Sequence, residues 1–175
     1  MNRYKFFVES IKNIKKTGTI TKSSQVLCRS MIKHIDFKMA KCIVELGAGD
    51  GVITKHILKA MRPDAILISF EVHPPFWDLL EEINDSRLVV AKESAEYIQK
   101  YLNEQGFEKA DYVVSGLPIV NLPKDLGYKI VQAAHDNLKK GGVYSQFHYS
   151  LLARKVYKTI FGNVKMDLVP LPSLL

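Results

Sequence analysis

Short apolar runs alternate with longer segments of helical periodicity from residue 41 to the end of the chain. Runs of this kind are buried on both faces when helices cover a parallel sheet. The pattern therefore predicts an α/β fold, a three-layer Rossmann-like arrangement with a mostly parallel sheet and helices on both faces. We expect strands at 41–46, 65–71, 87–91, 110–115 and 141–149, with helices at 51–61, 74–83, 93–105 and 124–140. A short helix near 151–160 and a strand near 164–170 complete the pattern, and the final strand is short or truncated.

The first forty residues have a different pattern, which predicts a basic amphipathic helical segment ahead of a cofactor-binding core at 41–175. In residues 3–16, apolar side chains recur at the spacing of one helical face and lysines surround them. The stretch "TGTITKSS" at 17–24 interrupts this pattern, and a serine there can begin a second helix that continues to about Ile35. We expect one domain over 1–175, since a chain of this length can bury a single core.

The net charge of +7 is concentrated at the beginning of the chain. Residues 1–41 hold ten Lys or Arg against two acids, whereas residues 42–175 hold fifteen against sixteen. A basic segment ahead of a neutral domain indicates an anionic partner, either a phosphate backbone or a lipid headgroup surface. The alternative is a solvated helix face that is simply rich in lysine.

Cys28 and Cys42 lie in apolar surroundings and lack the spacing of a redox pair or of metal ligands. We interpret them as reduced core residues and expect no metal site. The sequence contains no apolar run as long as a membrane span and no signal-peptide pattern at its N-terminus. The cytoplasm is the expected location.

The stretch "VELGAGDGV" at 44–52 follows the first predicted strand and opens the first helix, where parallel α/β folds bind ligands. Its glycines have GxGxG spacing, which differs from the GxGxxG of a dinucleotide site. Glu45 precedes them, and an acid there repels phosphate but suits a cationic ligand or one that bears hydroxyl groups. Glu71 ends the second strand, where a carboxylate can reach ribose hydroxyls. Together these features indicate S-adenosylmethionine, which carries a sulfonium and an ammonium but no phosphate; a tight turn and a surface acid are the alternative interpretations.

The chain resembles class I S-adenosylmethionine-dependent methyltransferases over nearly its whole length. More narrowly, it resembles bacterial phospholipid N-methyltransferases, which are similar to ribosomal RNA adenine dimethyltransferases. The matching stretches are "TGTITKSS", "VELGAGDGVIT", "FEVHPPF", "DYVVSGLPIVNLP", "LKKGGVYSQFHY" and "LPSLL".

The resemblance implies a set of cofactor-binding residues in this chain. Glu45 and the glycine loop would line the methionine and ribose part, Glu71 would hold the ribose hydroxyls, and Val72 would flank the adenine. Ser94 stands where the family often has an acid next to the adenine; its hydroxyl can bond the adenine amino group, or it can simply cap a helix. The full set is Glu45, Gly47, Ala48, Gly49, Gly51, Glu71, Val72, Ser94 and Ser115.

The loop "SGLPIVNLP" at 115–123 departs from the motif of the adenine methylases. In that family an Asn of the motif holds the target base, and an aromatic side chain stacks on it. This chain has Gly116 and Ile119 at the aligned positions. A flipped adenine would therefore have no Asn side chain to hydrogen-bond it and no aromatic ring to stack on, which argues against nucleic acid as the acceptor.

Ser115, His148 and Tyr149 are the candidate catalytic residues. Ser115 lies in the substrate loop, and "SQFHY" places the other two near the end of the neighbouring strand. His148, whose pKa lies near neutrality, could accept a proton from an ammonium group, and Tyr149 could contact a cation. Structural roles at a strand end and in the core are the alternatives.

These observations favour a methyltransferase that acts on a phospholipid amine headgroup. The alternatives are an RNA adenine methyltransferase, a small-molecule N- or O-methyltransferase, and a cofactor-binding protein without turnover. In the first case residues 3–16 could bind an anionic membrane surface, so that a cytoplasmic enzyme would lie at the periphery of the inner membrane. The oligomeric state stays open.

Overall fold

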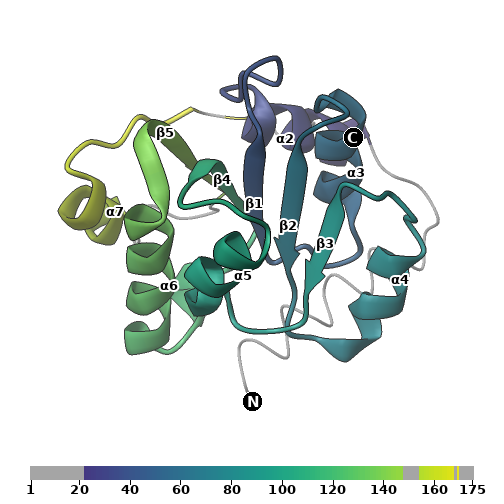
Figure 1. The fold of residues 1–175 in the computed structure, drawn as a ribbon. Helices are drawn as coiled ribbons and strands as arrows, with labels where there is room; N and C mark the ends of the chain where they lie inside the picture. Colours follow the sequence, from purple (N-terminus) through teal and green to yellow (C-terminus); the bar gives the residue numbers. More distant parts are fainter. Residues whose placement is uncertain (1–21, 148–153, 168, 170–175) are drawn as a thin grey trace.

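The computed structural model describes residues 22–147, 154–167 and 169. Five parallel strands form one sheet in the order β3-β2-β1-β4-β5 (Figure 1). Their bounds are β1 Cys42–Leu46, β2 Ile66–Phe70, β3 Leu88–Ala91, β4 Ala110–Ser115 and β5 Leu138–Gln146. The first strand is central: β2 and β3 are added on one side of it, and β4 and β5 on the other. The strand order therefore switches between β1 and β4, and the carboxyl ends of these two strands flank the switch point.

Helices cover both faces of this sheet and make the three layers that the sequence predicts (Figure 1). The α-helices are α2 Lys22–Ile32, α3 Val52–Ala60, α4 Trp77–Glu81, α5 Ile98–Glu104, α6 Lys124–Asp136 and α7 Arg154–Phe161. Short 3₁₀ turns, η1 Pro74–Phe76, η2 Ala95–Tyr97 and η3 Ile119–Asn121, follow the strands β2, β3 and β4. None of the helices in the described part of the chain has the length and hydropathy to cross a bilayer.

Two apolar cores lie on the two faces of the sheet, and β1 contributes to both. Val44 and Leu46 pack with residues of α5, α6 and α7, whereas Ile43 packs with residues of α2 and α3 on the opposite face. All five residues of β1 are buried, as expected for a central parallel strand. Cys28 and Cys42 are free and buried, so their prediction as core residues is confirmed.

The predicted helix at 124–140 extends too far. In the structure α6 ends at Asp136 and β5 begins at Leu138, which pairs with Ala110. The register then shifts, because the next pair joins Tyr112 to Val143. Residues between these two pairs bulge out of the ladder, and regular pairing begins at Val143, close to where the sequence places the strand.

The predicted strand near 164–170 is not formed over 164–167. Instead, the carboxylate of Asp167 lies 3.0 Å from Lys33 Nζ and 2.9 Å from His34 Nε2, which joins this segment to the end of α2. These side-chain contacts take the place of the backbone hydrogen bonds that a strand would make. The predicted helix at 3–16 and the stretch "LPSLL" lie outside the described residues.

We predict that Asp111→Ala lowers the free energy of unfolding by about 1–3 kcal/mol, because it removes the acceptor of two backbone donors. Asp111 Oδ2 accepts from Lys41 N at 2.8 Å and from Cys42 N at 2.9 Å, and Oδ1 accepts from Lys139 Nζ at 2.7 Å. These bonds fasten the beginning of β1 to β4. Urea denaturation measures the change.

The matched control is Asp64→Ala, which removes an exposed carboxylate that pairs with Arg62 two residues away. It should change the free energy of unfolding by about 0.5 kcal/mol or less. Equal losses in the two variants would contradict the anchoring role of Asp111.

Candidate functional site

The glycine loop is fixed by main-chain hydrogen bonds from both strands that flank β1. Gly47 N and Ala48 N both donate to Phe70 O at the end of β2, at 2.9 and 3.0 Å. On the other side, Gly116 N donates to Leu46 O at 2.9 Å, just beyond β4. The carboxyl ends of three strands therefore converge on one turn, which is where the sequence predicts the cofactor.

Two glycines of this loop are required for different reasons. Gly47 has φ +75°, and a Cβ there would lie 2.6 Å from Leu117 Cδ2 of the loop after β4. Gly49 has φ +56°, but a Cβ there would meet no atom within 4 Å. Gly47 thus permits close packing of two loops, whereas Gly49 borders open space in which a ligand could approach the backbone.

Glu45 is a buried carboxylate beneath the glycine loop, with a relative exposure of 1%. Its Oε2 accepts hydrogen bonds from Thr54 Oγ1 at 2.7 Å and from Ser69 Oγ at 2.6 Å. Its Oε1 has no hydrogen-bond partner among the described residues. Burial raises the pKa of Glu45 to about 7, and the nearby Glu71 adds to the rise, although the two hydroxyl bonds oppose it.

Glu71 joins the end of β2 to the glycine loop. Its Oε2 accepts from Gly49 N and its Oε1 from His73 N, both at 2.8 Å, so each oxygen retains a further lone pair. Trp77 Nε1 donates to the backbone oxygen of Glu71 at 2.9 Å and fixes the chain there. Burial raises the pKa of Glu71, and the backbone donors partly offset that rise.

Val72 and Ser94 lie where the sequence places the adenine contacts, after β2 and β3. Val72 follows Glu71 directly and has a relative exposure of 47%, which is high for an aliphatic residue beside a core strand. Ser94 occupies the N-cap position of η2, but its side chain makes no capping hydrogen bond. The helix-cap interpretation of its hydroxyl therefore lacks the contact that it requires.

A side chain at the end of β5 holds the loop after β4 by a hydrogen bond. Gln146 Nε2 donates to Leu117 O at 2.9 Å, and Gln146 Oε1 accepts from Tyr144 Oη at 2.7 Å. Ser115 is fully buried, and its Oγ accepts a weak hydrogen bond from Leu117 N at 3.3 Å. In this arrangement the Ser115 hydroxyl supports the turn, and its proposed contact with an acceptor or with the cofactor stays a prediction.

Gly116 and Ile119, the two departures from the adenine-methylase motif, both have a packing reason. A Cβ at Gly116 would lie 3.2 Å from Gly47 O, so a side chain there would press on the glycine loop. Ile119 is buried in the core formed with α6. Neither position presents a side chain to the edge of the sheet, whereas Val120 beside them is exposed.

His148 and Tyr149 lie outside the described residues, so their catalytic roles stay predictions. The structure adds residues that the sequence did not indicate: Thr54 and Ser69 bond Glu45, and Trp77 fixes the Glu71 backbone. The register of the sheet pairs Ser69 with Glu45 on neighbouring strands, which pattern alone does not reveal.

We predict that Glu45→Gln flattens the dependence of stability on pH. A carboxyl whose pKa is raised in the folded protein stabilises it fully below about pH 4.5, and this contribution is lost as pH rises through about 7. The wild type should therefore lose roughly 3 kcal/mol relative to the variant across this window. Denaturation curves at several pH values measure the difference, and parallel profiles for the two proteins would contradict it.

Comparison with known proteins gives the family. Residues 8–167 match the model of the methyltransferase small domain. An ornithine lipid N-methyltransferase of Singulisphaera acidiphila is 31% identical over 156 residues, which cover 87% of this chain and 81% of that protein. The ribosomal RNA small subunit methyltransferase H of Christiangramia forsetii is 31% identical over 90 residues, 51% of this chain but only 29% of that protein.

Solved structures support the same fold. A putative rRNA methylase from Clostridium thermocellum superimposes with a TM-score of 0.57 at 15% identity, covering 84% of this chain and 83% of that one. At this identity the likeness concerns the fold alone. Since the family match spans most of its length, the chain belongs to the methyltransferase small domain family and is a class I S-adenosylmethionine-dependent methyltransferase.

Proposed function

We propose that the glycine loop and the end of β2 hold S-adenosylmethionine. The open space at Gly49 would admit the ligand, and the Glu71 carboxylate would accept from the ribose hydroxyls. Val72 would flank the adenine, with Ser94 near its edge. Glu45, whose Oε1 lacks a partner among the described residues, supplies negative charge beneath a ligand that carries two positive groups.

We further propose that the methyl acceptor is the amine of a lipid headgroup. The supporting observation is the similarity to an ornithine lipid N-methyltransferase, which is 31% identical to this chain over a match that covers 81% of that protein. The loop after β4 supports the same choice, since Gly116 and Ile119 offer a base neither an amide nor an aromatic platform. Residues 3–16 would then meet the anionic surface of the membrane, at its cytoplasmic side.

The chemistry requires positioning more than acid–base strength. S-adenosylmethionine supplies an electrophilic methyl group, and the acceptor must present a neutral amine in line with it. The new N–C bond would form as the methyl–sulfur bond breaks, which leaves a neutral thioether on the cofactor and a positive charge on the nitrogen, and that nitrogen would then lose a proton. His148 is the candidate base for that proton, and Tyr149 the candidate aromatic contact for the cation.

RNA remains the alternative acceptor. Its support is the partial match to ribosomal RNA methyltransferase H, which covers 29% of that protein, and the fold shared with the putative rRNA methylase. The lipid relative covers far more of both chains at the same identity. A small-molecule amine or hydroxyl stays a third candidate, and all three can be compared in one labelling assay.

We predict that Gly49→Ala weakens S-adenosylmethionine binding by about 10-fold or more, because the new methyl group would occupy the space that the ligand needs. The matched control is Gly106→Ala, at the end of α5. Gly106 has φ +76° and, like Gly49, no atom within 4 Å of a built Cβ. Both variants should lose about 1–2 kcal/mol of stability from the left-handed conformation.

Calorimetric titration measures cofactor affinity, and urea denaturation measures stability in the same two variants. Only Gly49→Ala should lose affinity. Equal affinities in the two variants would place the cofactor somewhere other than the glycine loop.

We predict that the protein transfers radiolabelled methyl groups from S-adenosylmethionine into amine-bearing lipid. Total lipid extract, total RNA and a mixture of small amines are offered separately, and label should appear in the organic phase of the first. Lipid whose amines have been acetylated is the control and should take up no label. Label in RNA alone would contradict the lipid assignment, and equal label in acetylated lipid would contradict N-methylation.

A further inference from the structure

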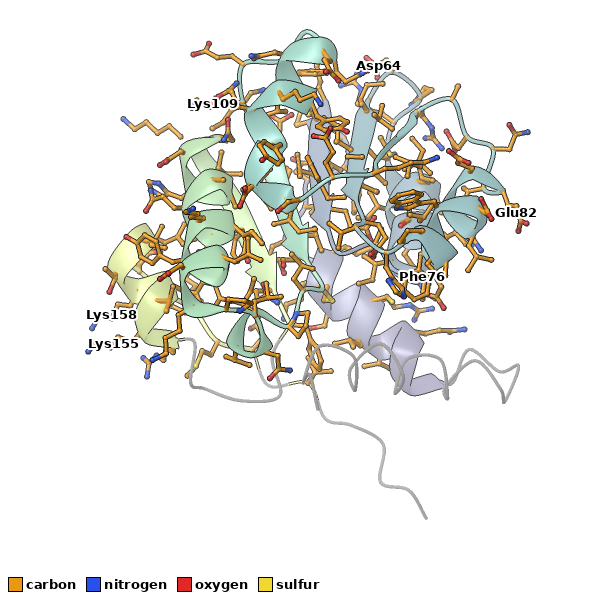
Figure 2. The ribbon with its side chains drawn as sticks, turned by 90° about the horizontal axis from the view of Figure 1, so that it is seen from below. Asp64, Phe76, Glu82, Lys109, Lys155 and Lys158 are labelled. Atoms are coloured by element: carbon orange, nitrogen blue, oxygen red, sulfur yellow. The ribbon has the colours of Figure 1, made fainter. Side chains whose placement is uncertain are left out.

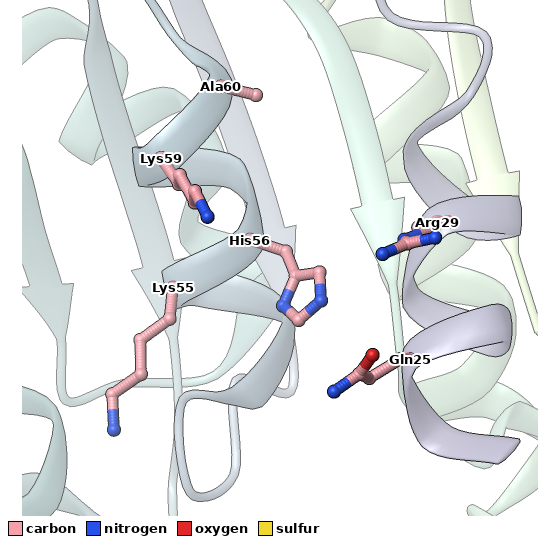
Figure 3. Close-up of a pocket in the computed structure, with 6 residues that line it drawn as sticks. All are labelled: Gln25, Arg29, Lys55, His56, Lys59 and Ala60. Atoms are coloured by element: carbon pink, nitrogen blue, oxygen red, sulfur yellow. The ribbon is translucent and has the colours of Figure 1, made fainter. Parts of the chain in front are cut away.

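A surface hollow of about 600 Å³ lies between α2 and α3 (Figure 3). Four of its lining side chains are basic or titratable: Arg29 comes from α2, and Lys55, His56 and Lys59 come from α3. Gln25 and Ala60 complete the lining. No residue of the glycine loop belongs to it, so the hollow is distinct from the proposed cofactor site.

The three permanent cations of the hollow have no counter-ion in the described part of the chain. Arg29, Lys55 and Lys59 are exposed, and none pairs with a described acid. Other basic side chains of the described chain do pair with an acid, as in Lys33–Asp167, Arg62–Asp64, Arg87–Asp85, Lys92–Glu81, Lys100–Glu93 and Lys139–Asp111. Three cations left unpaired around one concave site favour an anionic ligand that comes from outside.

The packing of α3 fixes the direction of these side chains. Thr54, Ile57 and Leu58 form the buried face of the helix, so Lys55 and Lys59 project from the other side. Figure 3 shows His56 between the two helices, pointing toward Gln25. The arrangement is therefore set by the core and does not depend on a mobile surface loop.

One wall of the hollow, α3, starts at the edge of the sheet that carries the proposed active site. α3 begins immediately after Gly51, the last glycine of the loop. In Figure 3 Lys55 lies nearer the arrowheads of the strands than Ala60 does. The helix α3 thus begins at the carboxyl edge, and an acidic surface in contact with the hollow would lie beside the glycine loop.

We infer that the hollow between α2 and α3 binds the acidic headgroups of an anionic lipid surface and thereby docks the enzyme on the membrane that holds its substrate. The inference deepens the proposed function and rests on it for the choice of a lipid surface as the partner. Each lysine or arginine near such a surface adds to the attraction, and three acting together raise the affinity on the order of 100-fold in a salt-sensitive way.

The test compares two triple variants of the full chain that remove the same charges. Arg29→Gln, Lys55→Gln and Lys59→Gln empty the hollow of permanent charge. The control removes one arginine and two lysines from α7: Arg154→Gln, Lys155→Gln and Lys158→Gln. All three control residues are exposed, and Figure 2 shows Lys155 and Lys158 extending outward from α7.

Flotation with phosphatidylcholine vesicles, with and without phosphatidylglycerol, measures binding. The wild type should bind only the anionic vesicles, and the hollow variant should lose affinity on the order of 100-fold. The α7 variant should change by no more than a few-fold. S-adenosylmethionine affinity, measured by calorimetry, should be unchanged in both and verifies that they fold.

Three results would overturn the inference: a wild type that ignores anionic vesicles, equal losses in the two variants, and loss of RNA binding without loss of vesicle binding. The proposed function is tested separately by methyl transfer from the wild type to lipid dispersed in nonionic detergent. Docking that depends on the hollow together with failure of that transfer would contradict the acceptor alone. Transfer without any effect of the hollow on docking would contradict the inference alone.

Discussion

The site depends on how closely three backbone segments approach one another at the carboxyl edge of the sheet. Phe70 O accepts from Gly47 N and Ala48 N, while Leu46 O accepts from Gly116 N, so the turn after β1 is tied on both sides. A side chain at 47 would collide with the Leu117 side chain, and one at 116 would press on Gly47 O. The glycines are consequences of the main-chain geometry, and the space left at Gly49 is what makes the turn useful for binding.

Two carboxylates beneath that turn set its electrostatic character. Glu45 is bonded by two hydroxyls and Glu71 by two backbone N–H groups, and burial raises the pKa of both. Burying acids that no described lysine or arginine pairs with costs stability, so the fold retains them at an energetic disadvantage. A ligand that brings positive charge relieves that cost, which gives a physical reason why a sulfonium cofactor suits this turn better than a pyrophosphate does.

Periodicity located the five strands and most helices because parallel strands buried on both faces give continuous apolar runs, as in β1. It failed where long-range contacts decide the outcome. The bulge after Leu138 depends on pairing with β4, and the segment around Asp167 is held by the side chains of Lys33 and His34, just after α2. At the site, the motif identified Glu45 and Glu71, but Thr54 and Ser69 matter only because folding brings them to the Glu45 carboxylate.

The charge of the first 41 residues acquires a place in the fold through α2 and α3. Arg29 belongs to the basic segment, whereas Lys55 and Lys59 belong to a core that is nearly neutral in sum. The net charge of a segment therefore does not reveal the cluster. Acids elsewhere in the core offset Lys55 and Lys59 in the count, but some of these acids form ion pairs with other basic residues. Salt screens electrostatic attraction beyond about 10 Å, so the local arrangement of charges determines how an anionic surface is attracted. Here two of those charges lie on α3, which begins next to the glycine loop.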